Sequence, residues 1–441
     1  MNIIKQLRSL IDTVVFTFWR LDKRQGVMLL LSLGAILMKI IIPPNPASTP
    51  ILVLGMFLLI FSIYKFSRDV FKTKNLKISY DRHMYDLIEN LRPSLKEARD
   101  SYESVVNQYR DGEAFTYSKK INQKLRDNEI QPQIVEHYEK QNQLKQCLAE
   151  NKDAFVQIIR RQWWLSLLRG KVFINEKKIG LSSSLLSDSK ELLIFKTDYF
   201  TSFLTNGLLT CRVTLESNGK ANEFYKSAAD FVINSGGVKQ TKDLDEYVGV
   251  GHLGISSIAI TKDKYMCLWS QSTMAQHSEE LLAPTGSGSL DWFDLMRNRK
   301  PENITVLNDT LNEGMRRELI EECNRKLRAN IFRREHIKKN LVIGFFRNLK
   351  RAGKPDFVGL CFLNVGHLML KPSWEGIEDE KYVKSRYEVK TFADLNTTVR
   401  NLLEEKKNLS ILSIPLYANL IALRDFINED ADGVKKFFEY E

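Results

Sequence analysis

The sequence predicts an α/β protein in which a C-terminal α/β domain follows a two-helix transmembrane hairpin and a helical and mixed linker region. Three features of the chain predict this organisation. Two apolar segments stand close together before residue 68, and a charged stretch rich in Glu, Lys and Gln follows them. From about residue 246, short apolar runs of strand length alternate with runs of helical periodicity.

The composition sets broad limits on partners and compartment. The chain has 441 residues, enough for two or three domains. Its net charge of +11 favours a membrane surface or anionic nucleotide ligands. Nucleic-acid binding is the second explanation of this charge, but no aromatic–basic recognition motif accompanies it, so no nucleic-acid partner is expected. The cysteines are odd in number and lack zinc-ligand spacing, which suits a reducing cytosol.

Residues 26–68 are predicted to form the transmembrane hairpin. Val27–Ile42 has Lys39 as its only charge and Ile51–Tyr64 has none, and each reaches the roughly 20 residues of a span only with its flanks. Lys and Arg gather on both outer flanks and not in the connecting turn, so both termini are expected in the cytoplasm. The basic flank, residues 1–25, lies either in the membrane interface or free in the cytosol. A cleaved signal peptide is the alternative for the first segment, although a second apolar segment follows at once.

Two regions connect the hairpin to the C-terminal domain. Residues 75–169 are charged and helical, and form either a stalk between protomers of a homo-oligomer or an ordinary helical bundle. Residues 170–245 are a mixed linker or sensor region in which Leu192–Phe195 has the pattern of a buried strand. Hydroxyl, amide and cationic side chains follow that strand, and they suit nucleotide binding or helix capping and turns. These side chains are Lys196, Thr197, Asp198, Tyr199, Thr201, Ser202, Thr205 and Asn206.

The glycines Gly249, Gly251 and Gly254 have the spacing of a dinucleotide-binding motif, but that interpretation is rejected. The motif should follow a strand and open a helix. Here it precedes Ile255–Ile260, which has the pattern of a strand and is followed by a second strand over Tyr265–Ser270. The sequence therefore predicts a hairpin with a glycine-rich entry at the start of the C-terminal sheet.

The C-terminal domain is organised around the stretch Arg317–Cys323. Apolar residues recur every four positions and predict one buried helical stripe; they are Leu311, Met315, Leu319, Cys323 and Leu327. Glu318, Glu321 and Glu322 stand at i, i+3 and i+4, so they are expected to share the opposite, solvent-exposed face. A hard divalent cation, Mg²⁺ or Mn²⁺, would relieve the repulsion between these carboxylates. Arg317 can orient one of them by a bidentate contact.

The alternative interpretation of this helix is a solvated surface laced with ion pairs. Three favourable i,i+4 pairs support it. They are Glu313 with Arg317, Glu321 with Arg325, and Glu322 with Lys326. On spacing alone, the two interpretations are equally supported.

Arg317–Glu322 resembles the second half of the Nudix box, Arg-Glu-apolar-x-Glu-Glu-x-Gly. The chain departs from the box at three places: Asn324 replaces the final glycine, Asn303 the first glycine, and Asp309 the first glutamate. A closer counterpart of the glycine loop is Pro284–Ser289, which implies an insertion before the helix. Asn tolerates the left-handed conformation of a helix end, so the change at the last position is mild.

The resemblance implies an α+β Nudix sandwich over residues 246–441 and a metal-dependent pyrophosphohydrolase of nucleoside diphosphates linked to another moiety. Arg317, Glu318, Glu321 and Glu322 would be the catalytic residues. The three glutamates would bind Mg²⁺ or Mn²⁺, with the carbonyl of Gly288 as a further ligand. One glutamate would serve as the base through a metal-bound water. The residues that recognise the nucleotide substrate stay unknown.

The order of the parts also looks like that of the two-transmembrane Nudix effectors of bacterial cyclic-oligonucleotide antiphage signalling (CBASS). This resemblance rests on the domain order, on Lys196–Phe200 and on Pro284–Asp291 joined to the box. It implies an antiviral defence protein of the bacterial inner (cytoplasmic) membrane, with two spans in contact with lipid and a cyclic nucleotide as trigger. The alternative is a degenerate Nudix domain that senses a nucleotide and drives the hairpins to assemble and disrupt the membrane.

Overall fold

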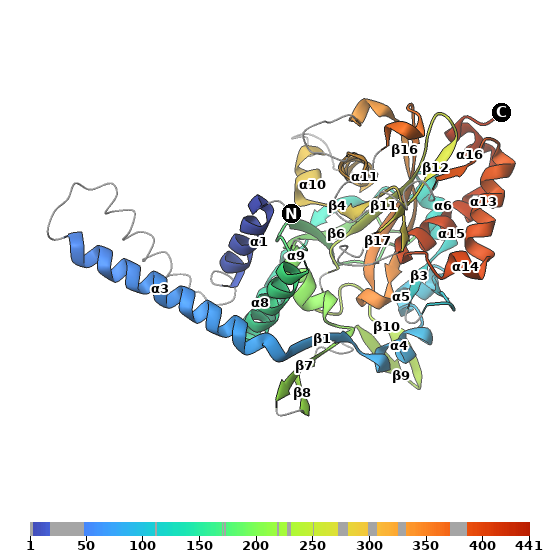
Figure 1. Cartoon of the computed structure of the whole chain (residues 1–441). Helices are drawn as coiled ribbons and strands as arrows, with labels where there is room; N and C mark the ends of the chain where they lie inside the picture. The colour runs from blue at the N-terminus through green and yellow to red at the C-terminus, as the bar shows by residue number, and fades with distance from the viewer. Residues whose placement is uncertain are drawn as a thin grey trace.

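The computed structural model describes residues 3–17, 48–110, 113–169, 171, 173–217, 220–226, 231–249, 251–271, 281–298, 307–324, 332–370 and 386–441. Within these ranges the chain is a mixed α/β protein with several sheets (Figure 1).

An eight-stranded mixed sheet is the centre of the fold, with the strand order β18-β12-β11-β17-β16-β3-β2 and β15 paired with β11. Its strands are β2 (Glu103–Val106), β3 (Ala114–Tyr117), β11 (Gly254–Ile260), β12 (Tyr265–Cys267), β15 (Gly286–Ser289), β16 (Ile337–Asn348), β17 (Lys354–Leu363) and β18 (Arg386–Glu388). β11 and β17 are parallel, and the other described pairs are antiparallel. Every residue of β11 and β17 is buried, as expected of central strands covered on both faces.

Helices cover both faces of this sheet (Figure 1). One face carries α11 (Leu307–Cys323), and the other carries α13 (Phe392–Glu404), α15 (Ile414–Glu429) and α16 (Ala431–Phe438). Neighbouring side chains of a strand point to opposite faces of a sheet. In β16, Val342 accordingly packs in the core beneath α11 and Ile343 in the core beneath α15.

The sheet extends beyond the range 246–441 predicted for the Nudix-like domain. β2 and β3 belong to the predicted helical region 75–169, yet β3 pairs with β16 through Phe346 and Tyr117. The same region also supplies α6 (Lys119–Arg126), whose Asn122 accepts a hydrogen bond from the Phe345 amide at 2.9 Å. The N-terminal part of the chain therefore helps to build the central sheet.

The remaining elements surround this sheet in smaller sheets and helices. The strands are β1 (Leu76–Tyr80), β4 (Gln133–Glu136), β5 (Lys177–Leu181), β6 (Glu191–Asp198), β7 (Cys211–Ser217), β8 (Lys220–Lys226), β9 (Val232–Ser235), β10 (Val238–Thr241), β13 (Trp269–Ser270) and β14 (Leu282–Ala283). The helices are α1 (Ile3–Val15), α3 (Ser48–Lys72), α4 (Arg82–Glu89), α5 (Leu95–Arg99), α7 (Tyr138–Glu150), α8 (Lys152–Leu168), α9 (Tyr199–Ser202), α10 (Trp292–Asn298) and α14 (Lys406–Leu409).

Three sequence predictions about strands are confirmed. Gly254 is the first residue of strand β11, so the glycine motif precedes a strand and not a helix. Tyr265–Ser270 contains β12 and β13, and β12 pairs with β11. Leu192–Phe195 lies inside β6, where Leu192, Ile194 and Phe195 are fully buried.

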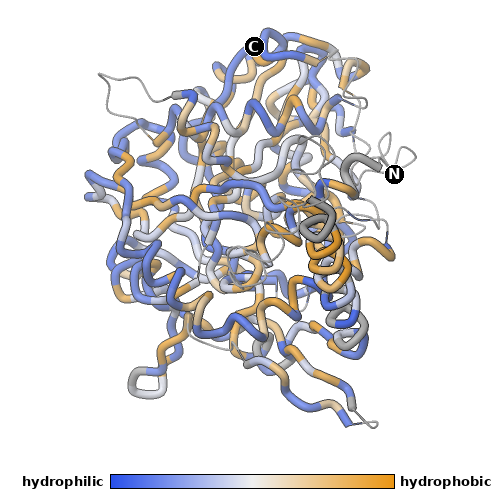
Figure 2. Tube along the Cα trace, turned by 90° about the vertical axis from the view of Figure 1, so that its left-hand side faces the viewer, coloured by the Kyte–Doolittle hydropathy of each residue, from blue (hydrophilic) through white to orange (hydrophobic). Residues whose placement is uncertain are grey.

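The prediction of a two-span transmembrane hairpin is wrong, and with it the prediction of a multi-pass inner-membrane protein. In the described ranges, no helix is long and apolar enough to cross a membrane. The second predicted span, Ile51–Tyr64, lies in the 25-residue helix α3, and Lys65 and Arg68 follow it in the same helix. The uncharged part of α3 is thus shorter than the roughly 20 apolar residues of a span. Figure 2 shows the hydropathy of the described residues along the chain trace. The first predicted span, Val27–Ile42, lies outside the described residues.

Candidate active site

Helix α11 lies directly against the glycine strand β15. Its predicted apolar stripe is confirmed from Leu311 to Cys323, where the four stripe residues are at most 1% exposed; Leu327 lies outside the described residues. A Cβ atom on Gly286 would stand 2.9 Å from the Leu319 Cα, and one on Gly288 would stand 2.2 Å from the Glu318 carboxyl carbon. Only glycine at these two positions lets the helix and the strand approach so closely. The fold thus brings Gly288 to the box glutamates.

Arg317 is the central cation of the site. Its guanidinium donates two hydrogen bonds to the Asp294 carboxylate, from Nε to Oδ1 and from Nη2 to Oδ2, both 2.9 Å long. Nη2 also donates to the Ser289 carbonyl at 2.9 Å, and Nη1 donates to Glu318 Oε1 at 3.0 Å. The bidentate partner of Arg317 is therefore Asp294 and not one of the three glutamates. Sequence reasoning missed Asp294, because it lies on α10 inside the predicted insertion.

The three glutamates differ in exposure, so the prediction of a shared exposed face is wrong for Glu318. Glu318 is only 9% exposed, Glu322 is half-buried and Glu321 is exposed. Glu318 lies beneath β15, where its Oε1 accepts a hydrogen bond of 3.2 Å from the Ser289 amide. Glu321 Oε2 approaches Arg317 Nη1 at 3.4 Å.

Burial and crowding disfavour the ionised form of these carboxylates. Burial raises the pKa of Glu318 to about 7; Arg317 opposes this shift and Glu321 reinforces it. Burial, together with the charges of Glu318 and Glu321, raises the pKa of Glu322 to about 8. Glu322 forms no hydrogen bond or ion pair with any residue in the described ranges. Burial is thus the main cause of both shifts, and the neighbouring carboxylates add to it at Glu322, which has no cation among the described residues to oppose the shift.

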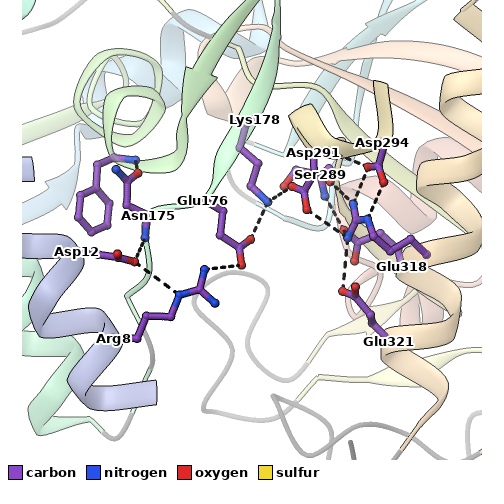
Figure 3. A network of polar contacts seen from close by, with 12 residues as sticks. Arg8, Asp12, Asn175, Glu176, Lys178, Ser289, Asp291, Asp294, Glu318 and Glu321 are labelled. Carbon is purple, nitrogen blue, oxygen red and sulfur yellow. Dashed lines mark hydrogen bonds and ion pairs between the residues drawn. The ribbon is translucent and has the colours of Figure 1, made fainter. Parts of the chain in front are cut away.

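A wider network of acidic and basic side chains lies beside helix α11, which carries the box residues (Figure 3). Lys178 of β5 donates hydrogen bonds to Asp291 and, at 2.9 Å, to Glu176. Asp291 lies 3.5 Å from Arg317 Nη1, and Arg8 of helix α1 lies 3.7 Å from Glu176. The sequence held no local signal for this arrangement, because β5 is more than a hundred residues from α11.

The charge of this network fits a divalent cation. Among the described residues, seven carboxylates in or beside the network face three cations, Arg8, Lys178 and Arg317. The carboxylates are Asp12, Glu176, Asp291, Asp294, Glu318, Glu321 and Glu322. Carboxylate oxygens are the ligands that Mg²⁺ and Mn²⁺ prefer. In the described ranges, no three His, Cys, Asp or Glu side chains converge as metal ligands do. The site therefore suits a divalent cation by the type of its ligand atoms and by its negative charge.

The alternative ion-pair prediction is only partly tested. Glu313 pairs with Arg334, at 2.8 Å, and with Arg316, at 3.8 Å, and no pair joins it to Arg317 within the described part of the chain. Arg325 and Lys326 lie outside the described residues, as does Asn303.

Asn324 replaces the final glycine of the box and closes the helix with its side chain. Its amide nitrogen donates to the Ile320 and Phe332 carbonyls, and its amide oxygen accepts from the Phe332 amide. These bonds fix the chain that returns after the helix.

The polar residues at the end of β6 and after it have structural partners. Asp198 is the N-cap of α9 and accepts from the amide and the hydroxyl of Thr201 at 2.9 and 2.8 Å. Asn206 donates to the Ala352 carbonyl at 3.3 Å, and the Lys196 ammonium stands 5.3 Å from the centre of the Trp292 ring. The contacts of Asp198 agree with the capping interpretation, whereas Asn206 and Lys196 make tertiary contacts. The nucleotide-sensing role of these residues stays a prediction.

A scan against protein-family models found no match, and a search of the curated proteins found none either. The function proposed below is therefore argued from the site.

Proposed function

We propose that the protein is a metal-dependent hydrolase of phosphoanhydride bonds, of the Nudix type, acting on nucleoside diphosphates linked to another moiety. The observation that carries the proposal is the position of Glu318, Glu321 and Glu322. They crowd on one helix that lies against a glycine strand, and the cations around them do not balance their charge. Carboxylates that are grouped and partly buried destabilise a fold, and a bound cation would explain why these three are grouped.

In this proposal Glu318, Glu321 and Glu322 hold Mg²⁺ or Mn²⁺, and the carbonyl of Gly288 is a further ligand. The bound metal would neutralise the diphosphate oxygens, polarise the attacked phosphorus and lower the pKa of water. Arg317 orients Glu318, because its guanidinium is fixed by two hydrogen bonds to Asp294 and one to the Ser289 carbonyl. One of the three glutamates takes up the proton of the attacking water.

A second candidate function is a module that binds a nucleotide without cleaving it. One observation favours it: the Glu318 carboxylate is already engaged by Arg317 and by the Ser289 amide. A site that never binds metal would keep these two contacts permanently.

Hydrolysis assays on the full chain distinguish the two candidates. The purified protein is incubated with dinucleotide cofactors, nucleoside triphosphates and sugar nucleotides, with Mg²⁺ or Mn²⁺, and with or without cyclic dinucleotides as trigger. The double variant Glu321→Gln, Glu322→Gln is the matched control, because it keeps the shape of both side chains and removes their charge. Turnover that requires metal and is lost in the control supports the hydrolase. Nucleotide binding without turnover under every condition refutes it and leaves the binding module.

A further inference from the structure

Lys178 is a buried cation at the edge of the candidate active site and comes from outside the box. Lys178 is 5% exposed. Its ammonium donates hydrogen bonds to Asp291 and to Glu176, and the bond to Glu176 is 2.9 Å long. Burial lowers the pKa of Lys178, but Glu176 and Asp291 outweigh this effect and raise the value above its usual range. The side chain therefore remains a charged ammonium at all physiological pH values.

The backbone around Lys178 is tied to the glycine strand and is therefore firmly placed. The amide of the next residue, Ile179, donates to the Leu290 carbonyl at 3.2 Å, and its carbonyl accepts from the Leu253 amide at 2.8 Å. Leu290 directly precedes Asp291, so the same strand that carries Lys178 also fixes the start of the Asp291 segment. The ammonium and its carboxylate partners are thus held in place from both sides.

Lys178 is connected to the box by a single intermediate residue. Asp291 accepts from Lys178 and lies 3.5 Å from Arg317 Nη1, and Arg317 contacts Glu318 (Figure 3). The charge of Lys178 also acts on Glu318, whose pKa it lowers. Without this ammonium, the Glu176 carboxylate would keep only its contact with Arg8 among the described residues. Within the same ranges, the Asp291 carboxylate would keep only its contact with Arg317 and would compete with Glu318 for that cation.

We propose that Lys178 is a positioning residue that serves as the built-in counter-ion of Asp291 and Glu176, and so confines divalent cations to Glu318, Glu321 and Glu322. It does so in two ways. Its positive charge repels a metal ion from the Asp291 side of the network, and its hydrogen bond keeps Asp291 from withdrawing Arg317 from Glu318. The inference rests on the proposed metal site and adds the residue that limits where the metal binds.

A purely structural ion pair predicts a different result. Loss of such a pair would lower the stability of the fold but would not strengthen metal binding. If Lys178 is the counter-ion, its loss leaves two carboxylates for a cation to bind, and affinity for Mn²⁺ rises while turnover falls. The two roles therefore change metal affinity in different ways.

The test compares Lys178→Met with Lys177→Met in the full chain. Lys177 is the matched control, because it is the neighbour on β5, it is mostly exposed and it pairs with Asp198 at 3.7 Å instead of with the site. Calorimetric titration with Mn²⁺ in the absence of nucleotide is expected to show about tenfold tighter binding, or one further bound ion, in Lys178→Met only. We expect kcat to fall about tenfold with little change in KM for the nucleotide, and Lys178→Arg to restore most of it.

The charge-paired double variant Lys178→Met, Asp291→Asn keeps the test decisive if the single variant folds poorly. It removes one cation and one carboxylate together, so its Mn²⁺ affinity is expected to be lower than that of Lys178→Met and close to that of the unaltered protein. Equal Mn²⁺ affinity in Lys178→Met and Lys177→Met overturns the inference and leaves the proposed function intact. Failure of the unaltered chain to bind Mn²⁺ refutes the proposed function itself, and this inference with it.

Discussion

Replacing Glu322 by Gln is expected to stabilise the metal-free protein at alkaline pH and to have little effect at acid pH. The pKa of this carboxyl is raised from 4.5 to about 8 in the fold. A group with a raised pKa favours the folded state while it is protonated, so its contribution is complete below 4.5 and is lost as pH rises through about 8. The Gln side chain is neutral at every pH and escapes this loss.

The magnitude follows from the shift. Each pKa unit corresponds to about 1.4 kcal/mol, which sets an upper limit of about 4–5 kcal/mol above pH 8. Because Glu322 is half-buried, solvent reduces both the effect of burial and the repulsion from Glu318 and Glu321, and we expect a gain of about 2 kcal/mol. Urea denaturation with a chelator, at about pH 5 and about pH 8.5, measures it. Equal or lower stability of Glu322→Gln at the higher pH would refute the argument that burial and the neighbouring carboxylates disfavour the charged form of Glu322.

Added metal provides the complementary measurement. A ligand that binds only the folded state stabilises it in proportion to the logarithm of its concentration over its dissociation constant. Excess Mg²⁺ at about pH 8 should therefore stabilise the unaltered chain, and should stabilise Glu322→Gln much less. If both proteins gain equally, the cation binds elsewhere.

Three further variants test other contacts. Asp294→Asn removes the charge that fixes Arg317; we expect kcat for nucleotide hydrolysis to fall about 10–100-fold, and the thermal midpoint to fall in a melting scan because Asp294 is fully buried. Gly288→Ala places a methyl group where the carboxylate beneath β15 lies, and stabilisation by Mg²⁺ should be lost in the same scan. Arg347→Met leaves Glu97 as an unpaired charge, since both side chains are 0% exposed and 2.8 Å apart; urea denaturation should show a loss of about 3–5 kcal/mol, partly recovered by Arg347→Met, Glu97→Leu.

The sequence predicted what depends on local periodicity. The stripe from Leu311 to Cys323 repeats at helical spacing, and the strand Ile255–Ile260 is an uninterrupted run of apolar and small residues, so both were visible without the fold. β2 and β3 were not predicted. Each has four residues within a highly charged region, and so short a run has no period to measure. They are strands because β3 pairs with β16 and β2 pairs with β3.

The residues that position the site were invisible for a different reason. Asp294 belongs to the insertion, and Lys178 reaches Asp291 across 113 positions of sequence. The contacts that place these two residues at the site, with Arg317 and Asp291, join distant parts of the sequence, so no spacing rule could identify them. The box pattern identified the three glutamates from the sequence. The residues that orient them are found only through tertiary contacts.

The burial of Glu318 connects the stability of the fold to its proposed chemistry. A carboxylate that is 9% exposed would ordinarily be selected against at a helix surface that could have carried an apolar residue. Here the fold holds it with Arg317 and a backbone amide while Glu322, one turn further on, has no partner among the described residues. Natural sequences keep such local conflicts where function requires them. The grouped carboxylates destabilise the metal-free fold, and a bound cation removes this destabilisation. The same carboxylates should therefore make metal binding strong.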